Sequence, residues 1–87
     1  MSLHVVQITK YAGKELQVLP SKEIKKVLVK IKLLANNPRP NGCKKLAGLH
    51  ENLWRIRIGD YRVIYSIDDS IKIIEIRRVG HRRDIYL

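Results

Sequence analysis

The first half of the chain changes from a strand-like to a helix-like spacing of its apolar residues. The segment LHVVQI, residues 3–8, is short and rich in β-branched side chains, which favours an opening strand. Beyond it, apolar residues recur every three to four positions, as in a helix with one buried side. This spacing predicts one helix capped by Thr9 and stopped by Pro20, and a second helix capped by Ser21. NNPRPNG, residues 36–42, is typical of a loop.

In the second half the apolar period falls to two, which predicts strands with one buried face. The predicted strands are KKLA at 44–47, LWRIRI at 53–58, YRVIYSI at 61–67 and IKIIEIRRV at 71–79. Gly59 and Asp60 form a two-residue hairpin turn, and residues 68–70 form the next turn. Apolar residues on both sides of the strand at 71–79 indicate a central position in the sheet.

These elements predict one α+β domain over residues 1–87. Their order is β-α-α-β-β-β-β, with a mostly antiparallel sheet and the two N-terminal helices packed on one face. An apolar content of 45% is sufficient for one hydrophobic core. No apolar run approaches the roughly 18 residues of a membrane span, and no signal-peptide pattern opens the chain. Because a single cysteine fits a reducing compartment, a cytoplasmic location is expected.

The net charge of +10 indicates the kind of partner that the protein binds. A field of this sign attracts polyanions and speeds encounters with nucleic acid, although a merely solvated basic surface is the simpler alternative. Nine of the ten lysines precede residue 46, whereas seven of the eight arginines follow residue 54. Arginine grips phosphate with two hydrogen bonds, so the second half is the expected place of contact.

Alternation along the predicted strands places these arginines. Arg55 and Arg57 point away from Trp54, Ile56 and Ile58, and Arg62 points away from the apolar residues of its own strand. If the apolar sets meet the helices, the three arginines converge on the open face of the sheet. The run HRRDIY, residues 81–86, leaves the last strand close by. The further candidates for phosphate binding are Lys44, Lys45 and Arg83.

A basic surface of this kind suits cleavage of RNA without a metal. The attacking group can be the 2′-hydroxyl of the substrate, so the protein must only orient the phosphate, neutralise growing charge and handle protons. Arginines serve the second task, His81 is a candidate base, and Tyr86 can donate to the leaving oxygen or stack on a base. The sequence contains no metal-ligand spacing and no glycine-rich phosphate loop, so no metal or cofactor is expected.

Each candidate also has an ordinary explanation. These are surface pairing of Arg62 with Asp60 or Asp84, solvated side chains at Arg55 and Arg57, a surface histidine at His81, and a packing role for Tyr86.

Four segments, in this order and spacing, resemble the RelE branch of the RelE/ParE toxin superfamily. They are KELQVLP, LANNPRPNGCKKLAG, LWRIRIGDYRVIYSI and VGHRRDIY, and the resemblance covers essentially the whole chain. It implies the toxin of a type II toxin–antitoxin pair, a metal-independent ribonuclease that cuts mRNA in the ribosomal A site. The implied products are a 2′,3′-cyclic phosphate and a 5′-hydroxyl, and the implied partners are the ribosome and a cognate antitoxin.

The resemblance also assigns roles to single residues. Arg62 in GDYR and Arg82 in GHRRDIY match arginines that stabilise the scissile phosphate, and Tyr86 matches a tyrosine that contacts the substrate. Arg55 and Arg57 match positions that other members fill with lysine.

The arginines at these two positions leave the general base open. Arginine, with a pKa above about 12, cannot accept a proton at neutral pH. Either these positions act by charge alone or the base lies elsewhere, and the hypothesis is His81.

Two other classes of function stay open from the sequence. One is a non-catalytic inhibitor of DNA gyrase, as in the ParE branch, and the other is a nucleic-acid-binding module without activity. A contact inhibitor has no need of the set His81, Arg82 and Tyr86, so the ending of the chain favours the nuclease.

Overall fold

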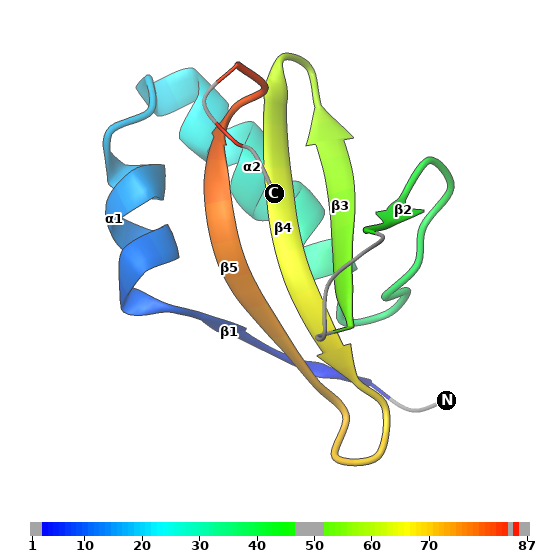
Figure 1. Ribbon diagram of the computed structural model, residues 1–87. Helices are drawn as coiled ribbons and strands as arrows, with labels where there is room; N and C mark the ends of the chain where they lie inside the picture. The colour runs from blue at the N-terminus through cyan, green and yellow to red at the C-terminus, as the bar shows by residue number, and fades with distance from the viewer. Residues whose placement is uncertain (1–2, 47–51, 84, 86–87) are drawn as a thin grey trace.

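The computed structural model describes residues 3–46, 52–83 and 85, and its elements follow the predicted order (Figure 1). They are β1 (Val5–Ile8), α1 (Lys10–Gln17), α2 (Ser21–Leu33), β2 (Lys44–Lys45), β3 (Leu53–Ile58), β4 (Tyr61–Asp68) and β5 (Ile73–His81). The predicted α+β class is confirmed. None of the helices in the described ranges is long and apolar enough to cross a membrane.

The strands form one five-stranded sheet in the order β1-β5-β4-β3-β2. β1 runs parallel to β5, and every other pair of neighbours is antiparallel. The strand predicted to be central, β5, lies between β1 and β4 and is thus an internal strand, while β4 is the middle strand of the five. Ile74 and Ile76 of this strand are fully buried, as a strand with neighbours on both sides allows.

Both helices cover the same face of the sheet. In Figure 1, α2 passes behind the strands and α1 lies beside β5, which leaves the near face of β3 and β4 without a helix. The core between helices and sheet consists of Ala12, Leu16, Val27, Ile31, Leu34, Ile56, Ile58, Val63, Tyr65, Ile67, Ile74, Ile76 and Val79. The uncovered side of the sheet is called the open face below.

The two helix starts differ in how they are capped. The Thr9 hydroxyl accepts a hydrogen bond from the Ala12 N–H at 3.1 Å, as predicted. The prediction that Ser21 caps the second helix is wrong, because Pro20 occupies the cap position and Ser21 is the first helical residue. Proline suits this place since it has no N–H that would need a partner.

The turn between β4 and β5 lies further along the chain than predicted. The Asp68 carboxylate accepts hydrogen bonds from the Ser70 N–H and hydroxyl and from the Ile71 N–H. Lys72 then adopts a left-handed φ of 56°. These contacts hold residues up to Lys72 in the turn, so the strand predicted at 71–79 begins two residues later and extends to His81.

A polar cluster ties this turn to the N-terminal half of the molecule and makes folding sensitive to acid. Arg39 Nη2 donates to Asp69 at 2.8 Å, and His4 Nε2 lies 3.1 Å from the same carboxylate. The hydrogen bond from Arg39 and then that from His4 lower the pKa of Asp69. A carboxylate with a lowered pKa stabilises the fold above its ordinary pKa of about 3.9 and loses this effect as the pH falls through the lower value.

Asp69→Asn is therefore expected to flatten the dependence of stability on pH below about 4. Denaturant unfolding at pH 7, 4 and 3 measures this effect. Asp60→Asn is the control, since the Asp60 side chain makes no ion pair within the described ranges. A variant that loses stability in acid as steeply as the wild-type protein would contradict the assignment.

Candidate functional site

The strand registers bring four basic side chains together on the open face. Arg57 pairs with Arg62 across β3 and β4, Arg55 pairs with Ile64, and Lys44 of β2 pairs with Arg55. Cross-strand partners point to the same side of a sheet, and the residues between these positions point into the helix-covered core. Lys44, Arg55, Arg57 and Arg62 therefore form what is called the cationic face below. The predicted convergence of the three arginines agrees with this register.

The cationic face carries charge that the described part of the protein does not neutralise. Burial, followed by the like charges of Arg62 and Arg57, lowers the pKa of Arg55. The Nε atoms of Arg55 and Arg62 are buried and have no hydrogen-bond partner in the described part. Among the described residues, no acidic side chain forms an ion pair with these arginines, so Arg62 does not pair with Asp60. Such a face is suited to bind an anion.

Arg82 lies at the same end of the sheet as Arg62. Its backbone N–H donates to the Asp60 carbonyl at 2.8 Å, one step beyond the last ladder pair. Arg62 itself pairs with Gly80, two residues before Arg82. In Figure 1, the turn between β3 and β4 and the chain that follows β5 accordingly lie together at the top of the sheet.

His81 and Lys45 do not join the cationic face. His81 pairs with Tyr61, with ring centroids 5.7 Å apart in an edge-on arrangement, and Lys45 pairs with Trp54. Tyr61 and Trp54 pack against the helix-covered core, so their partners point to that side. His81 Nδ1 also accepts a hydrogen bond from the backbone N–H of Arg83 at 3.2 Å. The expectation that His81 gathers with Arg62 on one surface thus differs from the observed register.

The two remaining candidates lie at the end of the chain. Arg83 is exposed and makes no ion pair within the described ranges. Tyr86, like Asp84, lies outside the described residues. Between them Ile85 is buried on the open face, where it packs with Leu53 and Ile64. Sequence reasoning missed Ile85, and the available signal was one apolar residue within a polar run.

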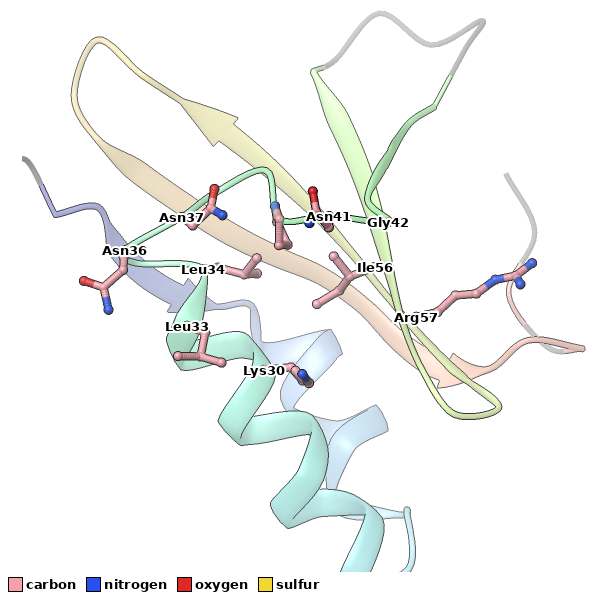
Figure 2. Close-up of a pocket in the computed structure, with 10 residues that line it drawn as sticks. Lys30, Leu33, Leu34, Asn36, Asn37, Asn41, Gly42, Ile56 and Arg57 are labelled. Atoms are coloured by element: carbon pink, nitrogen blue, oxygen red, sulfur yellow. The ribbon is translucent and has the colours of Figure 1, made fainter.

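A pocket of about 510 Å³ lies between the end of α2, the loop that follows it and β3. Its lining is Lys30, Leu33, Leu34, Asn36, Asn37, Pro40, Asn41, Gly42, Ile56 and Arg57. Figure 2 shows Leu34 and Ile56 facing one another across the pocket, whereas the side chain of Arg57 extends away from it. The pocket therefore belongs to the helix side of β3, and its lining contains cations and no acidic residue.

Known proteins resemble this chain over nearly its whole length. Residues 6–86 match the family described as the ParE toxin of the type II toxin–antitoxin system parDE. The protein named Toxin RelE from Mycobacterium tuberculosis is 41% identical over 83 residues, which span 93% of this chain and 84% of that protein.

Two solved structures extend the likeness to the fold. The archaeal RelE–RelB complex from Pyrococcus horikoshii contains a chain that superposes with a TM-score of 0.82 at 34% identity, over 95% of this chain and 99% of that one. The toxin–antitoxin complex RelBE2 from Mycobacterium tuberculosis gives a TM-score of 0.83 at 30% identity, over 97% of each chain. The names of these relatives indicate the RelE branch of the RelE/ParE superfamily.

Proposed function

We propose that this chain, which matches the ParE toxin family of type II toxin–antitoxin systems and belongs to the RelE branch of the RelE/ParE superfamily, is an endoribonuclease that cleaves mRNA in the ribosomal A site. The observation that carries the proposal is the cationic face. Three arginines lie there on the open face of the sheet, and no acidic side chain in the described ranges forms an ion pair with them. Resemblance to RelE toxins supplies the ribosome, which the geometry alone does not identify.

The proposed reaction needs no nucleophile from the protein. The substrate 2′-oxygen loses its proton and bonds to the adjacent phosphorus, and the bond from phosphorus to the 5′-oxygen breaks. The 5′-oxygen takes up a proton, so the products are a 2′,3′-cyclic phosphate and a 5′-hydroxyl. Arg62 and Arg82 bind the oxygens on which charge grows, while Arg55 and Arg57 hold the chain in line by its phosphates. Lys44 and Arg83 add to the field, and Tyr86 keeps its expected role against the substrate.

The location of His81 bears on how protons are handled. Its Nδ1 accepts from a backbone N–H, which leaves the proton of a neutral ring on Nε2 and no free lone pair for a substrate. The His81 ring also contacts the ring of Tyr61 edge-on, on the side of the sheet opposite the cationic face. We therefore propose charge stabilisation by the arginines as the principal source of rate, with His81 as base only if this segment rearranges.

His81→Ala is accordingly expected to lower the cleavage rate by less than about tenfold and to leave the shape of the pH–rate profile unchanged, because general acid–base catalysis contributes about 10²–10⁴-fold where it operates. Rates measured from pH 5 to 9 on mRNA-programmed ribosomes decide the point. An acidic limb that is present in the wild-type protein and absent from the variant would instead establish His81 as the base.

The cationic face offers little means of reading bases. Guanidinium groups suit phosphates, and phosphate contacts position a nucleic acid without specifying its sequence. A substrate held in this way is cut efficiently only if another body presents it in line, which agrees with dependence on the ribosome. Free RNA should therefore be cut poorly.

Cell-free translation of a defined mRNA, followed by mapping of new 3′ ends, tests the proposal. Cuts in phase with the codons that vanish in Arg62→Ala and Arg82→Ala support it. An intact message combined with loss of DNA supercoiling activity would point to the gyrase inhibitor of the ParE branch. An intact message that is merely retained by the protein would point to binding without activity.

The positive charge of the cationic face also indicates what kind of antitoxin would inhibit the protein. The RelE–RelB and RelBE2 complexes pair relatives of this chain with an antitoxin, and a cognate antitoxin is expected here. An acidic, partly disordered segment would neutralise the cationic face, with attraction that weakens in salt. The pocket beside β3 adds an apolar surface for the same partner, and its lining contains no acidic residue that would repel a negatively charged segment.

A further inference from the structure

Ile85 occupies an unusual place for a residue so near the end of the sequence. Only 3% of its surface is exposed, although Arg82 and Arg83 just before it are exposed. It packs against Leu53 and Ile64, which form a small apolar cluster on the open face, apart from the main core. Among the described residues after β5, Ile85 therefore lies against the open face of the sheet.

Gly80 makes room for this contact. A Cβ atom built on Gly80 would lie 3.2 Å from both Cδ1 and Cγ1 of Ile85, which is closer than ordinary packing. Gly42 and Gly59 have positive φ angles, whereas Gly80 does not, so its backbone shape does not call for glycine. Glycine suits position 80 because Ile85 occupies the space that a side chain there would fill.

Two of the residues that Ile85 contacts, Gly80 and Ile64, are cross-strand partners of arginines in the cationic face. Gly80 pairs with Arg62, and Ile64 pairs with Arg55. Cross-strand partners on one face lie about 4.5–5.5 Å apart at Cβ, so the stems of both arginines lie one strand away from residues that Ile85 contacts. The Nε atoms of these arginines are buried and unpartnered in the described part of the chain.

We infer that Ile85, seated on Gly80, is a positioning residue that directs the guanidinium groups of Arg62 and Arg55 and holds the segment of Arg82 over the substrate. This inference rests on the proposed nuclease function. Ile85 itself touches no reacting atom. It acts by excluding alternative rotamers of the arginines and by fixing where the chain crosses the open face.

Loss of this seat should affect the rate at saturation more than binding. Ile85→Ala is expected to lower the single-turnover cleavage rate on programmed ribosomes by about 10- to 100-fold, the scale of a displacement of about 1 Å in a catalytic group. The toxin concentration that gives half the maximal rate should change less than about threefold, because the charges that attract RNA remain. Ile85→Val keeps the apolar contact and should retain most of the rate.

Gly80→Ala supplies an independent approach to the same contact. The added methyl group meets Ile85 and should lower the rate by about tenfold in the wild-type background, yet cost almost nothing further in Ile85→Ala, since neighbouring sites are not additive. Ile71→Ala is the control, because Ile71 is 63% exposed in the turn at the other end of β5. Thermal unfolding of each variant separates a displaced segment from a failed fold.

The possible results distinguish this inference from the proposed function. If the wild-type protein cleaves and Ile85→Ala cleaves equally fast, the inference fails and the nuclease stands. Independent, additive costs of the two substitutions would also overturn it. If the wild-type protein does not cleave, the proposed function fails and takes the inference with it.

Discussion

Replacing Arg62 with alanine is expected to reduce mRNA cleavage by about 10²–10³-fold, the usual cost of removing one preorganised group that stabilises transition-state charge. The strand register places Arg62 in the cationic face, and the motif GDYR is the reason for proposing it as a phosphate-binding residue. Its Nε atom is buried and has no hydrogen-bond partner in the described ranges. The effect should fall on the rate at saturation, since Arg55 and Arg57 still attract the RNA.

The same substitution should leave the fold intact. Within the described ranges, Arg62 forms no ion pair, and the pKa of Arg55 is lowered by burial and then by the like charge of Arg62. Removing it relieves that repulsion, so the midpoint of denaturant unfolding should not fall.

Two further variants sharpen the test of Arg62. Arg62→Lys keeps the charge and loses the two-pronged geometry, so it should recover only part of the rate. Lys22→Ala, an exposed cation on the helix side of the molecule, should cleave like the wild-type protein. Equal losses in Lys22→Ala and Arg62→Ala would show that total charge matters and the location of Arg62 does not.

The cationic face could be predicted because it depends on local rules. Gly59 and Asp60 define a two-residue turn, and such a turn sets the register of the strands that flank it. Alternation then assigns Arg55, Arg57 and Arg62 to one side without reference to the rest of the molecule. The pairing of β2 with β3 extends this alternation and places Lys44 in the cationic face and Lys45 on the opposite side of the sheet. The sequence alone predicts phosphate binding for both lysines.

The end of the site could not be predicted because it depends on distant contacts. The ladder between β4 and β5 shifts register between Ile64 and Tyr65, which pair with Arg78 and Ile76, and this irregularity decides the side on which His81 points. Ile85 is buried by Gly80 and Ile64, residues with which it shares no local pattern. Position along a chain indicates which end of the sheet a residue reaches, whereas its face depends on the exact register.

A second feature that the sequence concealed is the closure of the outer edge of β5. The parallel partner β1 pairs only as far as Ile8, opposite Ile76, and α1 lies beside the remaining part of β5. Glu15 of α1 accepts a hydrogen bond from the Val79 N–H at 2.9 Å and binds Arg78 through both carboxylate oxygens. The Glu15 carboxylate thus supplies the hydrogen-bond acceptor that a neighbouring strand would otherwise provide, and it holds the part of β5 that leads to the site.

Glu15→Ala is expected to destabilise the protein by about 1–3 kcal/mol, the cost of a buried N–H left without its acceptor. The pKa of Arg78 is raised chiefly by its hydrogen bonds to Glu15, which agrees with a close and partly buried pair. In a domain of this size, each kcal/mol corresponds to a fall of about 4–8 °C in Tm. Arg78→Ala should cost less than Glu15→Ala, since it leaves the carboxylate free to accept from Val79.

Glu23→Ala is the matched control, because Glu23 pairs with Lys26 at 3.9 Å on the surface and such pairs contribute about 0–1 kcal/mol. Denaturant unfolding measures all three variants, and equal losses in Glu15→Ala and Glu23→Ala would mean that the edge of β5 is closed by something other than this carboxylate.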